Sequence, residues 1–101
     1  MPTFHRVCRT EDVPDGQVRM VEADGTKIAL CRRNDKYFAL SNFCPHLTGN
    51  LGEGSLEGDE LVCPEHFWRF KIHSGRCVSM PNKPAHTFPV QIDEGWISVG
   101  L

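Results

Sequence analysis

The sequence lacks long apolar runs, a strong excess of one charge and any sustained helical period. No run of about 18 apolar residues predicts a transmembrane helix, and the start, MPTFHRVCRT, does not resemble a secretory leader. The 11 Lys and Arg residues nearly balance the 13 Asp and Glu residues, so net charge gives no support for a nucleic-acid partner. We therefore expect a soluble, cytoplasmic protein that binds neither membrane nor nucleic acid.

The chain also lacks an even number of cysteines. Five cysteines in 101 residues argue against a closed framework of disulfides, and in a reducing compartment they favour metal binding for some of the thiols. A chain of this length forms one domain, near the size at which a metal adds useful stability. We expect a single domain, residues 1–101, that is monomeric.

Short runs rich in β-branched and aromatic residues predict an all-β fold. Residues 23–25, 33–35 and 93–95 have the composition of hairpin turns. Pro89 interrupts an alternating run and predicts an edge or unpaired position there. The sequence thus indicates an antiparallel β-sandwich or barrel-like base formed by residues 1–41 and 82–101. The predicted strands are 4–8, 17–21, 27–32, 37–42, 87–92 and 96–99.

Residues 42–81 differ from the base in composition and in the length of their apolar runs. Glycines separate short apolar pieces, which predicts a loop-rich inserted subdomain whose backbone needs more than an apolar core to hold it. This segment contains two mixed pairs, Cys44-Pro45-His46 and Cys63-Pro64-Glu65-His66. Each predicted loop therefore supplies one thiol and one imidazole.

The ligand set of Cys44, His46, Cys63 and His66 is compatible with two kinds of metal site. A tetrahedral zinc ion accepts two thiolates and two imidazoles, but its usual motifs pair Cys with Cys and His with His. Mixed pairs fit a binuclear centre with two different ends, in which one iron takes both cysteines and the other takes both histidines. A zinc-stabilised interaction module remains the alternative.

The two pairs and their surroundings resemble the Rieske-type ferredoxins, the small carriers that serve multicomponent oxygenases. The residues that carry the resemblance are the two pairs, the glycine run 49–54, Phe70, Ser74-Gly75 and the proline-containing segment 80–84. The resemblance implies a [2Fe-2S] cluster with Cys44 and Cys63 on the inner iron and His46 and His66 on the outer iron. It also implies an electron carrier without catalytic residues.

The same resemblance implies two partners. An NAD(P)H-dependent flavoprotein reductase would donate the electron, and the terminal oxygenase of an aromatic-ring or related hydroxylating system would accept it. Two further alternatives stay open: the small Rieske-like subunit of an assimilatory nitrite reductase, and a domain that senses redox state through its affinity for a partner.

Several positions depart from related patterns. Phe67 follows the second histidine where the family usually has glycine, and a required positive φ would strain an aromatic residue there. Gly49 and Glu65 occupy the positions of the extra cysteines that form a disulfide in high-potential Rieske proteins. Trp68 and Phe70 replace hydroxyl residues that would donate to sulfur, so we expect a reduction potential low in the Rieske range, about −150 mV.

Charges and the remaining cysteines complete the expectations. Between residues 44 and 66 there are five acids and no Lys or Arg, which suggests an acidic face that attracts a partner over long range. Cys8 and Cys31 lie in predicted strands and are expected to pack in the interior. Cys77 lacks a histidine at useful spacing and is expected to be a structural or surface thiol.

Overall fold

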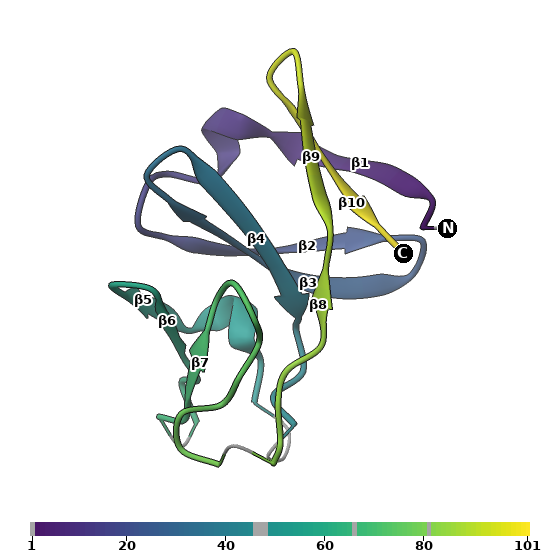
Figure 1. The fold of residues 1–101 in the computed structure, drawn as a ribbon. Coiled ribbons are helices and arrows are strands. Elements are labelled where there is room, and N and C mark those ends of the chain that lie inside the picture. Colours follow the sequence, from purple (N-terminus) through teal and green to yellow (C-terminus); the bar gives the residue numbers. More distant parts are fainter. Residues whose placement is uncertain (1, 46–48, 66, 81) are drawn as a thin grey trace.

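Strands dominate the structure, a computed structural model that describes residues 2–45, 49–65, 67–80 and 82–101 (Figure 1). Their pairing is antiparallel throughout, which confirms the all-β antiparallel prediction. The elements are β1 (Phe4–Arg9), η1 (Thr10–Asp12), β2 (Val18–Ala23), β3 (Thr26–Arg33), β4 (Lys36–Ser41), η2 (Leu51–Glu53), β5 (Ser55–Glu57), β6 (Glu60–Val62), β7 (Arg69–Lys71), β8 (Thr87–Phe88), β9 (Val90–Asp93) and β10 (Trp96–Gly100).

These strands form three sheets. One has the order β1-β10-β9, a second β2-β3-β4-β8, and a third β5-β6-β7. Two of the predicted hairpin turns, between β2 and β3 and between β9 and β10, place both central residues at positive φ, as two-residue hairpins with a right-handed strand twist require. Among the described residues, no helix is long and apolar enough to cross a membrane.

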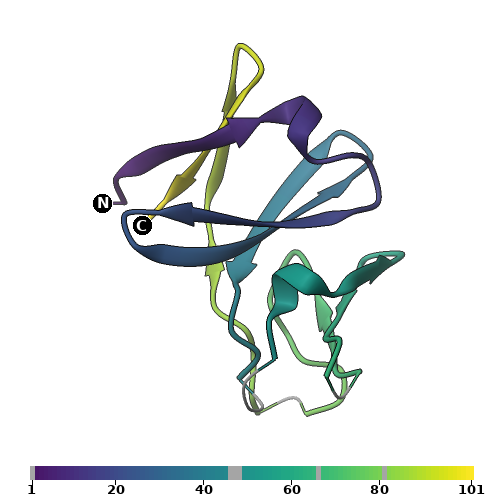
Figure 2. The same cartoon turned by 180° about the vertical axis from the view of Figure 1, so that it is seen from behind.

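Strand β3 lies between two apolar clusters because both of its faces are buried. Ile28 and Leu30 pack with residues of β10 and β4, whereas Ala29 and Cys31 face a cluster that includes Leu61 and other residues of the third sheet. A strand buried on both faces reads as a continuous apolar run, and residues 28–31 are all fully buried. The middle sheet is therefore shared by the base and by the segment below it in Figures 1 and 2.

Pro89 marks the point where the chain passes from one sheet to another. Strand β8, before it, pairs with β4, and strand β9, after it, pairs with β10. Pro89 belongs to neither strand, and its carbonyl accepts a hydrogen bond from the Gly100 N–H at 2.9 Å. The unpaired position predicted for this proline is confirmed, because a residue without an N–H cannot continue the ladder.

The inserted segment contains more regular structure than the sequence predicted. Three strands of three residues each, β5 to β7, form a small sheet between the loops. Strands this short leave almost no periodic signal, and Gly58 at positive φ forms the turn between β5 and β6. The described residues of the three loops, 43–45, 49–50, 63–65, 67–68, 78–80 and 82–83, lie at the end of the molecule farthest from the first sheet (Figure 2).

Candidate metal centre

The first cysteine loop closes on itself through its backbone. The Cys44 N–H donates to the Gly49 carbonyl at 2.9 Å, and Phe43 and Asn50 form an antiparallel bridge just outside it. Cys44 is only 2% exposed. His46 lies outside the described residues, although in the sequence it falls between the two residues that close this loop.

The second cysteine loop repeats this arrangement. The Cys63 N–H donates to the Trp68 carbonyl at 2.8 Å, again five residues along the chain, and the Phe67 N–H donates to the Cys63 carbonyl at 3.0 Å. The loop connects β6 to β7, so the small sheet fixes both of its ends. Cys63 is 1% exposed. His66, the fourth predicted ligand, also lies outside the described residues.

Gly49 lies between the two cysteines. A Cβ added at this glycine would be 2.5 Å from Cys63 Sγ, 3.5 Å from Cys44 Cβ and 3.1 Å from Glu65 Cγ. The missing side chain therefore leaves room beside the Cys63 sulfur, and both thiols belong to one buried cluster. Two soft ligands that converge beside a side-chain-free gap suit a metal centre with thiolates at one end. Glu65, on the second loop, is therefore also next to Gly49.

Asn42, which the sequence reasoning missed, anchors the first loop to its surroundings. It is the buried polar side chain of the described residues, at 2% exposure. Its Oδ1 accepts a hydrogen bond from the Gly52 N–H at 2.8 Å, and its Nδ2 donates to Asn50 Oδ1 at 3.2 Å. An asparagine that directly follows an apolar strand is a signal for such side-chain to backbone bonding.

A third loop lies against the second. The Val78 N–H donates to the Arg69 carbonyl at 2.8 Å, and the Met80 N–H donates to Cys77 Sγ at 3.3 Å. Cys77 is fully buried, so of the two roles predicted for it, structural or surface thiol, the structural one holds. This loop leads into the segment 80–84, of which Pro81 lies outside the described residues.

The other two cysteines lie on strands of the base, Cys8 on β1 and Cys31 on β3. Cys31 is fully buried, and burial raises its pKa to about 12. Cys8 is half-buried, and its pKa rises to about 11, first through burial and then through the nearby charge of Asp12. The interior role predicted for Cys31 is confirmed, and both thiols remain protonated near neutral pH.

The predicted acidic face is wrong for three of its five residues. Glu57, Asp59 and Glu60 on the small sheet pair with bases that follow the second loop. Arg69 contacts Glu57 and Glu60 at 2.8 and 3.3 Å, Lys71 contacts Glu60 and Asp59 at 3.1 and 3.5 Å, and His73 lies 3.8 Å from Asp59. The sequence separates these acids from the bases, but antiparallel pairing places Glu60 opposite Lys71.

The ion pairs change the titration of their members. The hydrogen bond from Lys71 lowers the pKa of Glu60, with smaller contributions from Arg69. The hydrogen bonds to Glu57 and Glu60 raise the pKa of Arg69, and the hydrogen bond to Glu60 raises that of Lys71. The ion pairs of Arg69 and Lys71 with these acids therefore persist near neutral pH, and their two positive charges offset part of the negative charge of the five acids between residues 44 and 66.

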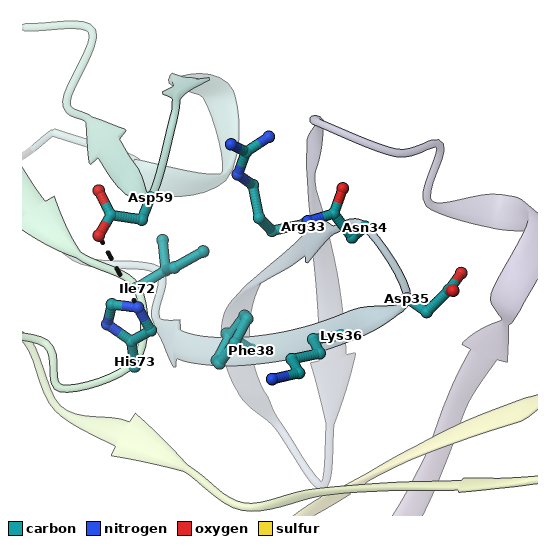
Figure 3. Close-up of a pocket in the computed structure, with 8 residues that line it drawn as sticks. All are labelled: Arg33, Asn34, Asp35, Lys36, Phe38, Asp59, Ile72 and His73. Carbon is teal, nitrogen blue, oxygen red and sulfur yellow. Dashed lines mark ion pairs between the residues drawn. The ribbon is translucent and has the colours of Figure 1, made fainter.

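A pocket of about 460 Å³ separates the β3–β4 turn from the small sheet (Figure 3). Phe38 and His73 meet edge to face there, with ring centroids 5.6 Å apart, and Asp59 faces the same histidine. Neither Cys44 nor Cys63 lines this pocket. The pocket lies between the base and the inserted segment, apart from the candidate metal centre.

Two loops with the same backbone hydrogen bond each present one buried thiol, and the two thiols lie on either side of Gly49 in a small β fold of three sheets. This is the arrangement of a metal-binding protein in which two loops supply the ligands. The chain belongs to the Rieske [2Fe-2S] domain family, which matches residues 3–91. The cofactor of this family is a Rieske-type [2Fe-2S] cluster, and the residues described above fit it.

Within this family, the chain is similar to ferredoxin components of oxygenase systems. It is 36% identical over 98 residues to the ferredoxin component of the p-cumate 2,3-dioxygenase system of Pseudomonas putida, an alignment that covers 94% of this chain and 83% of the relative. A solved complex of oxygenase and ferredoxin from carbazole 1,9a-dioxygenase contains a chain 31% identical to this one, with a TM-score of 0.88 and coverage of 99% and 94%.

A third neighbour shares the fold only. The structure described as a putative NADH-dependent nitrite reductase small subunit from Mycobacterium tuberculosis has a TM-score of 0.92, with coverage of 100% and 96%, but only 21% sequence identity. The architecture alone is therefore shared by chains whose names imply different redox systems, so the distinction between these systems depends on sequence identity and on the site.

Proposed function

We propose that this protein is a one-electron carrier that holds its cluster with Cys44, Cys63, His46 and His66. The two cysteines would ligate the inner iron and the two histidines the outer iron. When bound, the cluster accepts and returns a single electron. The observation that carries this assignment is the pair of hydrogen-bonded loops that brings two buried thiols together beside Gly49.

The chain's own residues would give the cluster a protected inner end. Cys44 and Cys63 lie in the same buried cluster as Phe70 and Leu51, so water has little access to the sulfurs. Residues beyond the cysteines, such as Glu65 and Phe67, are exposed. The electron would therefore enter and leave at the loop tips, on the side where the histidines fall in the sequence.

The partners follow from the relatives. The relative from Pseudomonas putida is the ferredoxin component of a p-cumate 2,3-dioxygenase system, and the relative from carbazole 1,9a-dioxygenase forms a complex with its oxygenase. We accordingly propose a terminal oxygenase as electron acceptor and an NAD(P)H-dependent flavoprotein reductase as donor. The base 1–41 and 82–101, the cluster-binding subdomain 42–81, the monomeric state and the cytoplasmic location are parts of the same proposal.

Metal and sulfide analysis tests the ligand assignment. The purified protein should contain two irons and two acid-labile sulfides per chain, as a [2Fe-2S] cluster requires. Replacing His46 or His66 by alanine should remove the cluster, because the outer iron would then keep only one protein ligand. His86→Ala is the matched control, since His86 is exposed and packs its ring on Phe88. One zinc and no iron in anaerobically prepared protein would contradict the proposal.

The nitrite reductase alternative has a separate test. The likeness of fold to the Mycobacterium tuberculosis chain keeps it open. Stable copurification with a large sirohaem-containing subunit from the native host would favour that assignment. Transient binding to an oxygenase, with reduction of its metal centres, would favour the carrier.

A further inference from the structure

Phe67 combines a strained backbone with an exposed aromatic ring. Its φ is +60° and 71% of its surface is accessible. Side chains rarely adopt this left-handed conformation, and a bulky residue in it is unusual. The other described residues with positive φ are glycines, or the short polar or acidic residues Asp24, Asn34 and Glu94 in hairpin turns. A glycine at position 67 would fit without strain, so the ring does not serve the loop's geometry.

The ring gains no interior packing in return for this strain. Burial would be the ordinary reason for a phenylalanine, but Phe67 is the most exposed of the large apolar residues in the described parts of the chain. Strained residues that the fold does not need are concentrated at binding and catalytic sites. The combination therefore indicates a contact made with another molecule.

Phe67 belongs to a group of exposed apolar side chains around the cluster loops. We call this group the apolar rim. Phe43 adjoins the first loop at 56% exposure, and Val78 and Met80 lie on the third loop at 47% and 40%. The loops adjoin one another through Gly49 and Cys63 and through the Val78–Arg69 hydrogen bond. Only two of the six large exposed apolar residues in the described parts, Met20 and Ile92, lie on the base.

Part of the charge near the rim is offset within the small sheet. Arg69 and Lys71 pair with Glu57, Asp59 and Glu60, which weakens the long-range field of the acidic run. Contiguous exposed apolar groups rimmed by polar residues mark protein interaction sites. The partner surface that fits this face is therefore an apolar recess, with few charges at its centre.

We propose that Phe67 is the anchor by which this protein docks into an apolar recess of the terminal oxygenase, with Phe43, Val78 and Met80 around it. The inference rests on the proposed function, because an electron acceptor must approach the cluster loops and Phe67 directly follows a predicted ligand in the sequence. A relative 31% identical over nearly the whole chain forms a complex with its oxygenase, which makes the acceptor the occupant of this face.

The test compares three variants with the parent protein, all loaded with the cluster. Phe67→Gly removes the ring and the strain together. Phe67→Leu keeps apolar bulk and should restore most of the binding. Ile92→Ser is the matched control, because Ile92 is an exposed apolar residue on β9. The binding partners are the oxygenase components of the carbazole 1,9a-dioxygenase and p-cumate 2,3-dioxygenase systems.

Titration calorimetry and stopped-flow reduction of the oxygenase give the expected results. Phe67→Gly should raise the Kd at least about tenfold, as the loss of an interface anchor does. Its iron content and reduction potential should equal those of the parent, and its Tm should be equal or higher. Ile92→Ser should bind like the parent, and raised salt should change the Kd only slightly.

Five results would overturn the proposal. Phe67→Gly could bind like the parent, Ile92→Ser could lose as much affinity, or Phe67→Gly could lose iron and Tm, which would make the ring structural. A parent that binds neither oxygenase would remove the acceptor as occupant, and a dimer that dissociates only in Phe67→Gly would replace it with a second copy. Reversible one-electron voltammetry of the same samples shows separately whether the carrier function stands.

Discussion

Gly49→Ala tests whether the space between the two cysteines is needed for the cluster. The added Cβ would lie 2.5 Å from Cys63 Sγ, whereas nonbonded heavy atoms prefer separations of about 3.5–4.0 Å. The sulfur or the loop backbone must therefore move by about 1 Å. Because Cys63 is a predicted ligand, this movement should reach the metal centre directly.

The expected magnitude follows from the size of the clash. Overpacking by one methyl group costs about 1–3 kcal/mol in free energy of unfolding. In a domain of this size each kcal/mol lowers the Tm by about 4–8 °C. We expect Gly49→Ala to melt roughly 5–20 °C below the parent and to retain less iron per chain after purification. Thermal scans and iron analysis of the same preparations measure both effects.

Gly25→Ala is the control, because it separates backbone strain from crowding. Gly25 has a φ of +79° and nothing within 4 Å of an added Cβ, so alanine there strains the turn and touches nothing. It should lower the Tm by a few degrees without changing the iron content. Full iron content and an unchanged Tm in Gly49→Ala would refute the reasoning that Gly49 makes room beside Cys63.

Two further predictions concern charge and potential. The pKa of Glu60 lies below its ordinary value of 4.5, so its stabilising contribution is present above that value and is lost as the pH falls through the lowered pKa. Glu60→Gln should melt below the parent at pH 7, and the difference should vanish in acid; Glu94→Gln, in the β9–β10 turn, is the control, and a pH-independent difference would contradict the argument. Because Trp68 and Phe70 offer no hydroxyl to sulfur, protein-film voltammetry should give a potential of about −150 mV, and a value near the upper Rieske limit of about +300 mV would disprove that explanation.

The sequence predicted the base well because its strands carry strong local signals. Branched residues at 27–32 and turn residues at 23–25 are sufficient to indicate the β2–β3 hairpin. Pro89 likewise predicts an interruption of the strand from its residue type alone, since proline has no N–H to donate. The four ligand positions also follow from local spacing, and they remain predictions because His46 and His66 lie outside the described residues.

Other features depend on contacts that spacing does not show. The strands β5 to β7 have three residues each, and their pairing decides that Glu60 faces Lys71. The separate blocks of acids and bases in the sequence therefore suggested an acidic face, whereas the small sheet pairs three of those acids with bases. Asn42 contacts Asn50 and Gly52, and Gly49 contacts Cys63 on the other loop, so their roles become visible only when the loops are assembled.

In the inserted segment, the contacts that stabilise the fold and the side chains that are exposed to solvent lie in different places. Phe70 and Ile72 are buried against the middle sheet, Asn42 fixes the first loop, and an ion pair ties β5 to β7. These contacts surround the segment from which the two cysteine loops extend, and both cysteines are buried there. Among the described residues of the loop tips, Phe67 has a strained φ of +60° and is 71% exposed to solvent. A carrier needs that separation, because a rigid ligand frame keeps reorganisation small while an apolar tip allows brief contact with a partner.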